Sequence, residues 1–173
     1  MSEMQTLGYG WSLSATIARP ARGTEPPLVG QWMSSPARMI PAATPLIDAY
    51  QMMMRWDIRR LPVVSGTQLI GIVTLGDLRE ARPAAAGRSS IYELNYQLAR
   101  LTVAQVMTHH PFVITPPTPI VEAAQLMLEQ KIGGLPVVDP RGVLVGIITE
   151  SDLFRGLIQH WDPGDRGREA GPG

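Results

Sequence analysis

Apolar residues follow a helical spacing in two separate segments of the chain. Over residues 45–56 and 118–130 they recur every three to four positions, the spacing of one helical face. Thr44 and Pro45 stand where an N-cap and a first-turn proline belong, and the same Thr-Pro pair opens the second segment. The sequence therefore predicts two amphipathic helices of similar design.

Each predicted helix is followed by two short apolar runs separated by a turn. The turn is Ser65-Gly66 in the first case and 139–142 in the second, so each pair of runs is typical of a β-hairpin. Each second run ends in a threonine, Thr74 or Thr149, which opens another short helical pattern. The predicted unit is helix, strand, strand, helix, preceded by a short extended strand at 39–40 or 113–114.

The two units match each other letter by letter. "LPVV" occurs at 61–64 and again at 135–138, and the following strands read "GIVTLGD" at 71–77 and "GIITESD" at 146–152. Self-similarity of this kind indicates an internal duplication. The chain is therefore two copies of one unit.

The duplication divides the chain into five parts. Outside the copies, Gly, Pro and charged residues dominate the ends, which we expect to be flexible. Ser90 and Glu93 have capping-box spacing in the connection, which predicts a short helix there. The parts are an N-terminal arm (1–28), the first copy (29–82), a linker with a short helix (83–101), the second copy (102–160) and a C-terminal tail (161–173).

Composition and charge exclude several classes of function. The 173 residues are 45% hydrophobic, enough for a real core, and 15 basic residues balance 15 acidic ones. A chain of zero formal charge has no broad footprint for nucleic acid or a membrane surface. The apolar runs are too short to cross a bilayer, and the N-terminus lacks the order of a secretory signal. With no cysteine, we expect a cytoplasmic protein.

The repeated motifs resemble those of a known family. A "VMT"-like opening (32–34 and 106–108), the "LPVV" strand and the "G-I-x-T-x-x-D" ending are similar to a tandem pair of CBS domains, the arrangement called a Bateman module. The resemblance covers residues 29–160. It implies an α/β (α+β) fold in which each repeat has a small sheet with flanking helices, and the repeats pack with pseudo-twofold symmetry into one module.

In that family, clefts between the repeats commonly bind adenine nucleotides. The resemblance therefore implies a regulatory module that senses AMP, ADP or ATP as a regulatory ligand, requires no cofactor and acts on a separate, unknown partner protein. A structural dimerisation scaffold with empty clefts is the alternative, and an S-adenosylmethionine or dinucleotide binder is a lesser one. Family members often pair through helices such as the one containing 52–54, three consecutive methionines, which favours a homodimer.

The "T-x-x-D" phrase has a chemistry of its own in each copy. The carboxylate of Asp77 or Asp152 offers two acceptor oxygens to a ribose diol, and the hydroxyl of Thr74 or Thr149 can donate to a phosphate. The same spacing is also that of a helix capping box, which would merely satisfy backbone amides. Both roles can coexist.

The resemblance also implies where an adenine would lie. It would contact the opening strand and the "LPVV" strand of each copy, although ordinary core packing is the alternative for every one of these residues. Arg38, Met39 and Pro41 depart from the small or β-branched residues frequent in that strand. The candidates are Met39, Ile40, Pro41, Leu61 and Pro62 in the first copy, and Val113, Ile114, Thr115, Leu135 and Pro136 in the second.

The copies differ just before "LPVV". The first has Arg59-Arg60 and the second a diglycine; in the family, basic residues here often reach the phosphates of a nucleotide whose ribose is held by the opposite repeat. The cleft of Asp152 would then be better charged and tighter, whereas the cleft of Asp77 would have only Lys131 nearby. Surface salt bridges of the arginines with Asp57 or Glu80 are the competing explanation.

No set of residues suggests catalysis. A nucleophile–base pair, a paired-carboxylate arrangement and a phosphate-gripping glycine loop are all missing from the sequence, so we expect no enzyme. Slow nucleotide hydrolysis in a cleft is the enzymatic alternative. His109 and His110 are adjacent, with only His160 to join them, and make a poor metal site.

Overall fold

The computed structural model describes residues 26–81 and 100–160. The predicted linker helix around Ser90, most of the N-terminal arm and the predicted C-terminal tail lie outside the described residues. The described residues contain both copies of the repeat, so the predicted order of elements in each copy can be compared directly with the structure.

Each copy has the predicted order helix, strand, strand, helix. The first copy contains α2 (Leu46–Arg55), β2 (Arg60–Ser65), β3 (Gln68–Thr74) and α3 (Leu75–Glu80). The second contains α5 (Ile120–Gln130), β5 (Gly134–Val138), β6 (Leu144–Thr149) and α6 (Glu150–His160). Short elements open each copy: α1 (Val29–Trp32) and β1 (Ile40–Pro41) in the first, and the 3-10 turn Val103–Gln105 and β4 (Thr108–His109) in the second.

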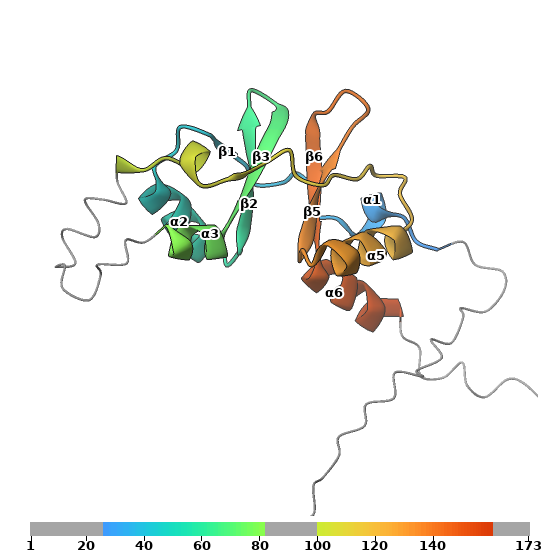
Figure 1. Ribbon diagram of the computed structural model, residues 1–173. Coiled ribbons are helices and arrows are strands. Elements are labelled where there is room, and N and C mark those ends of the chain that lie inside the picture. The colour runs from blue at the N-terminus through green and yellow to red at the C-terminus, as the bar shows by residue number, and fades with distance from the viewer. Residues whose placement is uncertain (1–25, 82–99, 161–173) are drawn as a thin grey trace, which may run out of the picture.

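The strands form two small sheets, one in each half of the molecule. In the first sheet the order is β1-β2-β3-β4, with β1 parallel to β2 and the other neighbours antiparallel. In the second sheet β5 pairs with β6 antiparallel, and Ile114 makes a parallel bridge to Val137 where the first sheet has β1. Figure 1 shows the two sheets side by side, with helices α2 and α3 in one half and α5 and α6 in the other.

The segment that opens each copy packs onto the other copy. Val29 of α1 is fully buried in the second core and its N–H donates to the carbonyl of Thr118, 2.8 Å away. In the same way, Val103 is buried in the first core and its N–H donates to Thr44. The two sequence copies are therefore interlocked rather than merely adjacent.

Part of the predicted N-terminal arm belongs to this packing. The carbonyl of Pro27 accepts a 2.8 Å hydrogen bond from the N–H of Ile120, and Leu28 forms an antiparallel bridge with Pro119. The ordered structure thus begins before Val29, because the backbone of this segment pairs with the start of α5.

Each half of the molecule has its own apolar core. In the first, Leu46 and Met53 of α2 pack against Leu61 and Val73 of the sheet, and the second core repeats this with Met127 and Leu135. Each fully buried side chain of this size contributes about 1.5–3 kcal/mol. The three consecutive methionines of α2 differ in their burial: Met53 is buried, whereas Met54 is 47% exposed.

The predicted helix caps are wrong by one residue. The N-caps of α2 and α5 are Pro45 and Pro119, without a side-chain cap, not the threonines before them. The hydroxyl of Thr118 faces backwards and accepts from the N–H of Thr115 at 3.3 Å. Each threonine instead closes a short turn before its helix, in which the N–H of Thr44 donates to Pro41 and the N–H of Thr118 to Thr115.

The hairpin tips join the two halves. Gln68 forms an antiparallel bridge with Val143, and the N–H of Leu144 donates to the carbonyl of Thr67 at 3.1 Å. These contacts fix the second sheet beside the first and so define the space between them. Within residues 26–81 and 100–160, no helix is long and apolar enough to cross a membrane.

Candidate functional site

Two clefts lie between the halves of the molecule. The first cleft, with a volume of about 820 Å³, is lined by the end of β3 and the start of α3, the start of β2, and the residues Lys131, Ile132, Gly133, Gly134 and Pro136. The second cleft, of about 510 Å³, is lined by the corresponding start of α6 and the loop from Asp57 to Arg60. Both volumes lie within the roughly 300–1,000 Å³ typical of small-molecule sites.

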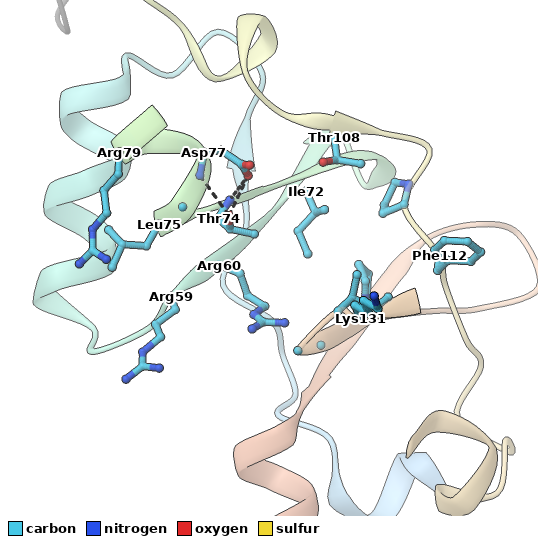
Figure 2. Close-up of a pocket in the computed structure, with 16 residues that line it drawn as sticks. Arg59, Arg60, Ile72, Thr74, Leu75, Asp77, Arg79, Thr108, Phe112 and Lys131 are labelled. Atoms are coloured by element: carbon cyan, nitrogen blue, oxygen red, sulfur yellow. Dashed lines mark hydrogen bonds between the residues drawn. The ribbon is translucent and has the colours of Figure 1, made fainter. Parts of the chain in front are cut away.

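Thr74 and Asp77 form a capping box at the edge of the first cleft. Oδ2 of Asp77 accepts from the backbone N–H of Thr74 at 2.7 Å and from its hydroxyl at 2.9 Å. The hydroxyl in turn accepts from the N–H of Asp77 at 3.3 Å. Figure 2 shows this pair beside the pocket. Oδ1 of Asp77 has no hydrogen bond within the described part of the chain, so the carboxylate keeps one acceptor for a ligand.

Asp152 accepts from Thr149 in the second cleft as Asp77 does from Thr74 in the first, and it has a further contact. Oδ2 of Asp152 accepts from the N–H and hydroxyl of Thr149 at 2.9 and 2.7 Å. Its Oδ1 is paired with Nη1 of Arg155 at 3.0 Å, and only 6% of the side chain is exposed. Both oxygens of Asp152 are thus occupied, so a ligand would have to displace or share the contact with Arg155.

The first cleft carries more positive charge than the sequence predicted. Lys131 lines it as predicted. This residue is the C-cap of α5 and has a left-handed backbone conformation. The expectation that Lys131 is its only nearby cation is wrong, because Arg59, Arg60 and Arg79 line the same cleft. Asp77 is its one carboxylate among the described residues. An anionic ligand would therefore meet four cationic side chains against one negative charge.

The second cleft has a more balanced charge. Arg59 and Arg60 line it, as predicted from the resemblance, and so do Arg38 and Arg155. Three carboxylates line it as well: Asp57, Glu150 and Asp152. The premise that this cleft is the better charged one is therefore not met. The reason is the two additional carboxylates, Asp57 and Glu150, and Glu150 stands where the first copy has an apolar residue, Leu75.

Arg60 lies against the diglycine of the opposite copy. A Cβ on Gly134 would stand 2.5 Å from Nη1 of Arg60, and a Cβ on Gly133 would stand 2.6 Å from Nη2. The guanidinium thus occupies the space that side chains at these two positions would fill. Figure 2 shows Arg60 extending toward the segment that carries Lys131, whereas Arg59 extends in another direction.

The surroundings of Arg60 change its electrostatics. Partial burial lowers the pKa of the Arg60 guanidinium, while the nearby carboxylate of Glu150 raises it and Arg59 lowers it. The predicted alternative, a salt bridge with Asp57 or Glu80, is not formed: the ion pairs within the described residues are Arg141–Asp139 and Arg155–Asp152. Arg59 and Arg60 therefore keep their donors available to an anion.

Most of the predicted adenine contacts lie in the cores or beside the clefts. Ile40, Leu61 and Leu135 are almost completely buried among apolar side chains, and Ile114 is 9% exposed. Of the ten candidates, Pro136 lines the first cleft. The others line neither cleft: Met39, Ile40, Pro41, Leu61, Pro62, Val113, Ile114, Thr115 and Leu135.

Several residues that line the clefts were not predicted as site residues. Arg79 and Arg155 follow the T-x-x-D phrases within one helical turn. This short spacing from the aspartate could have identified them, because residues within one turn of a helix start lie near the same cleft. Phe112 and Thr108 come from the segment that crosses to the first copy, which no local pattern reveals. They include Arg79, Thr108 and Phe112 in the first cleft, and Arg38, Glu150 and Arg155 in the second.

Metal binding has no support in the described part of the chain. No group of three or more acidic or histidine side chains there could hold an ion. His109 belongs to the edge strand β4, and His110 follows it with a positive φ of 48°. These histidines are exposed residues next to the first cleft.

Comparison with known proteins gives the same picture of the chain. The family model described as CBS domain matches twice, at residues 29–84 and 103–159. A CBS domain-containing protein of Dictyostelium discoideum is 37% identical over 137 residues, which span 79% of this chain and 94% of that protein. Inosine-5'-monophosphate dehydrogenase of Korarchaeum cryptofilum is 33% identical over 107 residues, but the match spans only 19% of that enzyme.

Solved structures of paired CBS domains have the same fold. The crystal structure of CBSX2 in complex with AMP superposes with a TM-score of 0.66 at 28% identity, covering 77% of this chain and 97% of that one. The CBS domain pair of protein MJ0100, in complex with 5'-methylthioadenosine and S-adenosyl-L-methionine, gives 0.65 at 25% identity, covering 78% and 98%.

CBSX2 is a chloroplastic protein of Arabidopsis thaliana, and its full sequence is 30% identical over 152 residues that span 63% of its length. The two matched segments, the interlocked α/β halves and the agreement with solved CBS pairs lead to one conclusion. The chain belongs to the CBS domain family and carries two CBS domains in tandem.

Proposed function

We propose that the protein is a regulatory module that binds an adenine nucleotide in the first cleft. The observation that carries this proposal is the arrangement of four cationic side chains around the Thr74–Asp77 pair. Cationic donors favour phosphate, and a carboxylate oxygen that has no partner among the described residues favours a ribose diol. The first cleft thus offers both polar halves of a nucleotide a complementary surface.

The apolar wall of the first cleft suits a base. Ile72, Phe112, Ile132 and Pro136 line the same space as the charged residues. Phe112 is 51% exposed, and an aromatic ring in that position gives a flat face on which adenine can stack. We therefore assign the base to this wall rather than to the opening strands, whose residues line neither cleft.

Charge decides the order of the two clefts in this proposal. The first cleft has a large excess of cations, whereas three carboxylates offset most of the cations of the second. Phosphorylated ligands should therefore prefer the first cleft, the reverse of the order expected from the sequence. AMP bound to the related CBSX2 supports the ligand class, and the nucleotide itself is part of the proposal.

A second candidate ligand is S-adenosylmethionine in the second cleft. This ligand carries a sulfonium and an amino group, so a site lined by Asp57, Glu150 and Asp152 suits it better than the first cleft does. The CBS pair of MJ0100 in complex with S-adenosyl-L-methionine supports the same class. A dinucleotide gains no specific support from either cleft.

The output of the module is proposed to lie in another protein. Ligand binding between two interlocked halves can change their relative orientation. A partner protein that binds one orientation more tightly than the other would then respond to the ligand. We propose a non-catalytic role in the cytoplasm, consistent with a chain that contains no cysteine. Chromatography of ATP after incubation with the protein tests the non-catalytic part, because any hydrolysis would release ADP.

We also propose that the module is a homodimer. Phe154, Leu157 and Ile158 of α6 are 57–76% exposed at helical spacing, and Leu128 of the neighbouring α5 is 79% exposed. Exposed apolar side chains gathered on adjoining helices are typical of protein–protein interfaces. The predicted contribution of the Met52–Met54 helix is consistent with the exposure of Met54.

Calorimetric titration of the nucleotide-stripped protein with AMP, ADP, ATP and S-adenosylmethionine tests the proposal. We expect saturable binding of an adenine nucleotide and a loss of roughly tenfold or more in Asp77→Asn, since hydrogen bonds to a charged group are strong. Asp139→Asn makes the same chemical change outside both clefts and should bind normally. A folded protein that binds none of these ligands would support the scaffold alternative.

A further inference from the structure

One side chain, Arg60, lines both clefts from a position between them. Arg59 lines both as well, but it is exposed and extends away from the second copy, whereas Arg60 is partly buried against Gly133 and Gly134. The second copy supplies no equivalent cation, because the diglycine stands where the first copy has its two arginines. Of the two arginines that line both clefts, Arg60 is therefore the one that lies against the second copy.

The resting place of Arg60 depends on the second copy. Oε2 of Glu150 also lies beside Gly133, 2.9 Å from the position of a Cβ on that residue, and its charge acts on Arg60. Glu150 lines the second cleft alone. The charge of Glu150 thus attracts Arg60 toward the second cleft without forming one of the ion pairs of the described residues, and the flexible Arg60 side chain also lines the first cleft.

From this geometry we infer that Arg60 is a phosphate-binding residue shared by the two clefts, so that a phosphorylated ligand in one cleft weakens phosphate binding in the other. The inference rests on the proposed function. Its physical basis is that the donors of one guanidinium form a fixed fork, which cannot align with two separated phosphates at once. A phosphate bound in the first cleft draws Arg60 away from Glu150. The carboxylate of Glu150 then repels any phosphate that enters the second cleft.

Two predictions distinguish a shared residue from two independent sites. The coupling must be reciprocal, because binding free energies are linked. It must also require a phosphate, so adenosine, which has none, should fill the clefts without coupling. Unequal intrinsic affinities alone would give two binding steps but neither of these effects.

The experiment is a calorimetric titration of AMP into four forms of the full chain: wild type, Asp77→Asn, Arg60→Ala and the double variant. Asp77→Asn weakens AMP binding in the first cleft, so the tighter step of this variant measures the second cleft beside a largely empty neighbour. The weaker step of the wild type measures the second cleft beside a filled neighbour. We expect the latter affinity to be lower by roughly tenfold, and the two affinities to converge when Arg60 is alanine.

One AMP per wild-type chain together with one AMP per Asp77→Asn chain is the limiting form of the expected result. Equal second-cleft affinities in the wild type and Asp77→Asn would overturn the inference and leave the proposed function intact, as would an Asp77→Asn protein that binds no AMP. A wild type that binds no AMP would overturn both. If Asp77→Asn fails to fold, Arg79→Ala replaces it, because Arg79 is exposed, lines the first cleft alone and takes no part in a capping box.

Discussion

The guanidinium of Arg60 occupies the space above Gly134 in which a side chain would otherwise stand. A Cβ there would lie 2.5 Å from Nη1 of Arg60 and 3.0 Å from the carbonyl oxygen of Ile148. The arginine could move, but the backbone of the neighbouring strand β6 could not do so without strain. The missing side chain of one copy thus makes room for the cation of the other.

Gly134→Ala should therefore displace Arg60 and lower the free energy of unfolding by about 1–3 kcal/mol. Chemical denaturation measures the loss. Gly76→Ala is the matched control, since the nearest atom to its Cβ is Oγ1 of Thr74 at 3.4 Å, and it should leave stability unchanged or raise it by up to about 1 kcal/mol. Equal effects of both substitutions would contradict the close contact with Arg60.

Gly156 in α6 should tolerate alanine badly for a different reason. Alanine normally stabilises a helix interior by about 1 kcal/mol relative to glycine, but here its Cβ would overlap the ring of Trp32 in α1. We expect a net loss of about 1–3 kcal/mol in the free energy of unfolding. A stabilised Gly156→Ala protein would show that α1 does not pack on α6, and combining it with Trp32→Leu should reduce the loss.

Asp139 should contribute stability that depends on pH. The backbone N–H of Val143 donates to its carboxylate at 2.9 Å, and with Arg141 this holds the pKa of Asp139 below its ordinary value of 3.8. A carboxyl with a lowered pKa stabilises the folded state above its unfolded pKa, and that stability is lost as the pH falls below about 4. The stability difference between wild type and Asp139→Asn should thus shrink between pH 7 and pH 3, which denaturation at both pH values measures.

The exposed face of α6 gives a direct test of the homodimer. Leu157→Glu places a charge among the apolar side chains of Leu128, Phe154 and Ile158, so it should convert the dimer to a monomer in analytical ultracentrifugation. Phe112→Glu, a similarly exposed apolar residue in the first cleft, should remain dimeric. A monomeric wild type, or a dimer unaffected by Leu157→Glu, would exclude this interface.

The sequence predicted the elements of each copy because its signals are local. Helical spacing, hairpin turns and the T-x-x-D phrases depend on neighbouring residues, and α2, α5, both hairpins and the capping box of Thr74 and Asp77 are found as predicted, while Asp152 accepts from Thr149 in the same way. The interlocked opening segments were not predicted. Val29 and Val103 each enter the core of the other copy, and no short-range pattern specifies which core receives an apolar residue.

The same limit explains the outcome for the candidate site. Spacing and resemblance brought Thr74, Asp77 and Lys131 to one cleft correctly, since the duplication implies facing copies. The charge balance of the clefts depended instead on where Arg60, Arg79 and Glu150 lie across the interface. That balance is a property of the packed pair, and it is the reason for proposing the reverse of the expected order of the two sites.

A crystal structure of the protein grown with AMP tests most directly whether the first cleft binds an adenine nucleotide. We expect AMP in the first cleft, with its ribose on Asp77 and its phosphate among the surrounding cations. Density for AMP in the second cleft alone, or in neither cleft at saturating concentration, would contradict it.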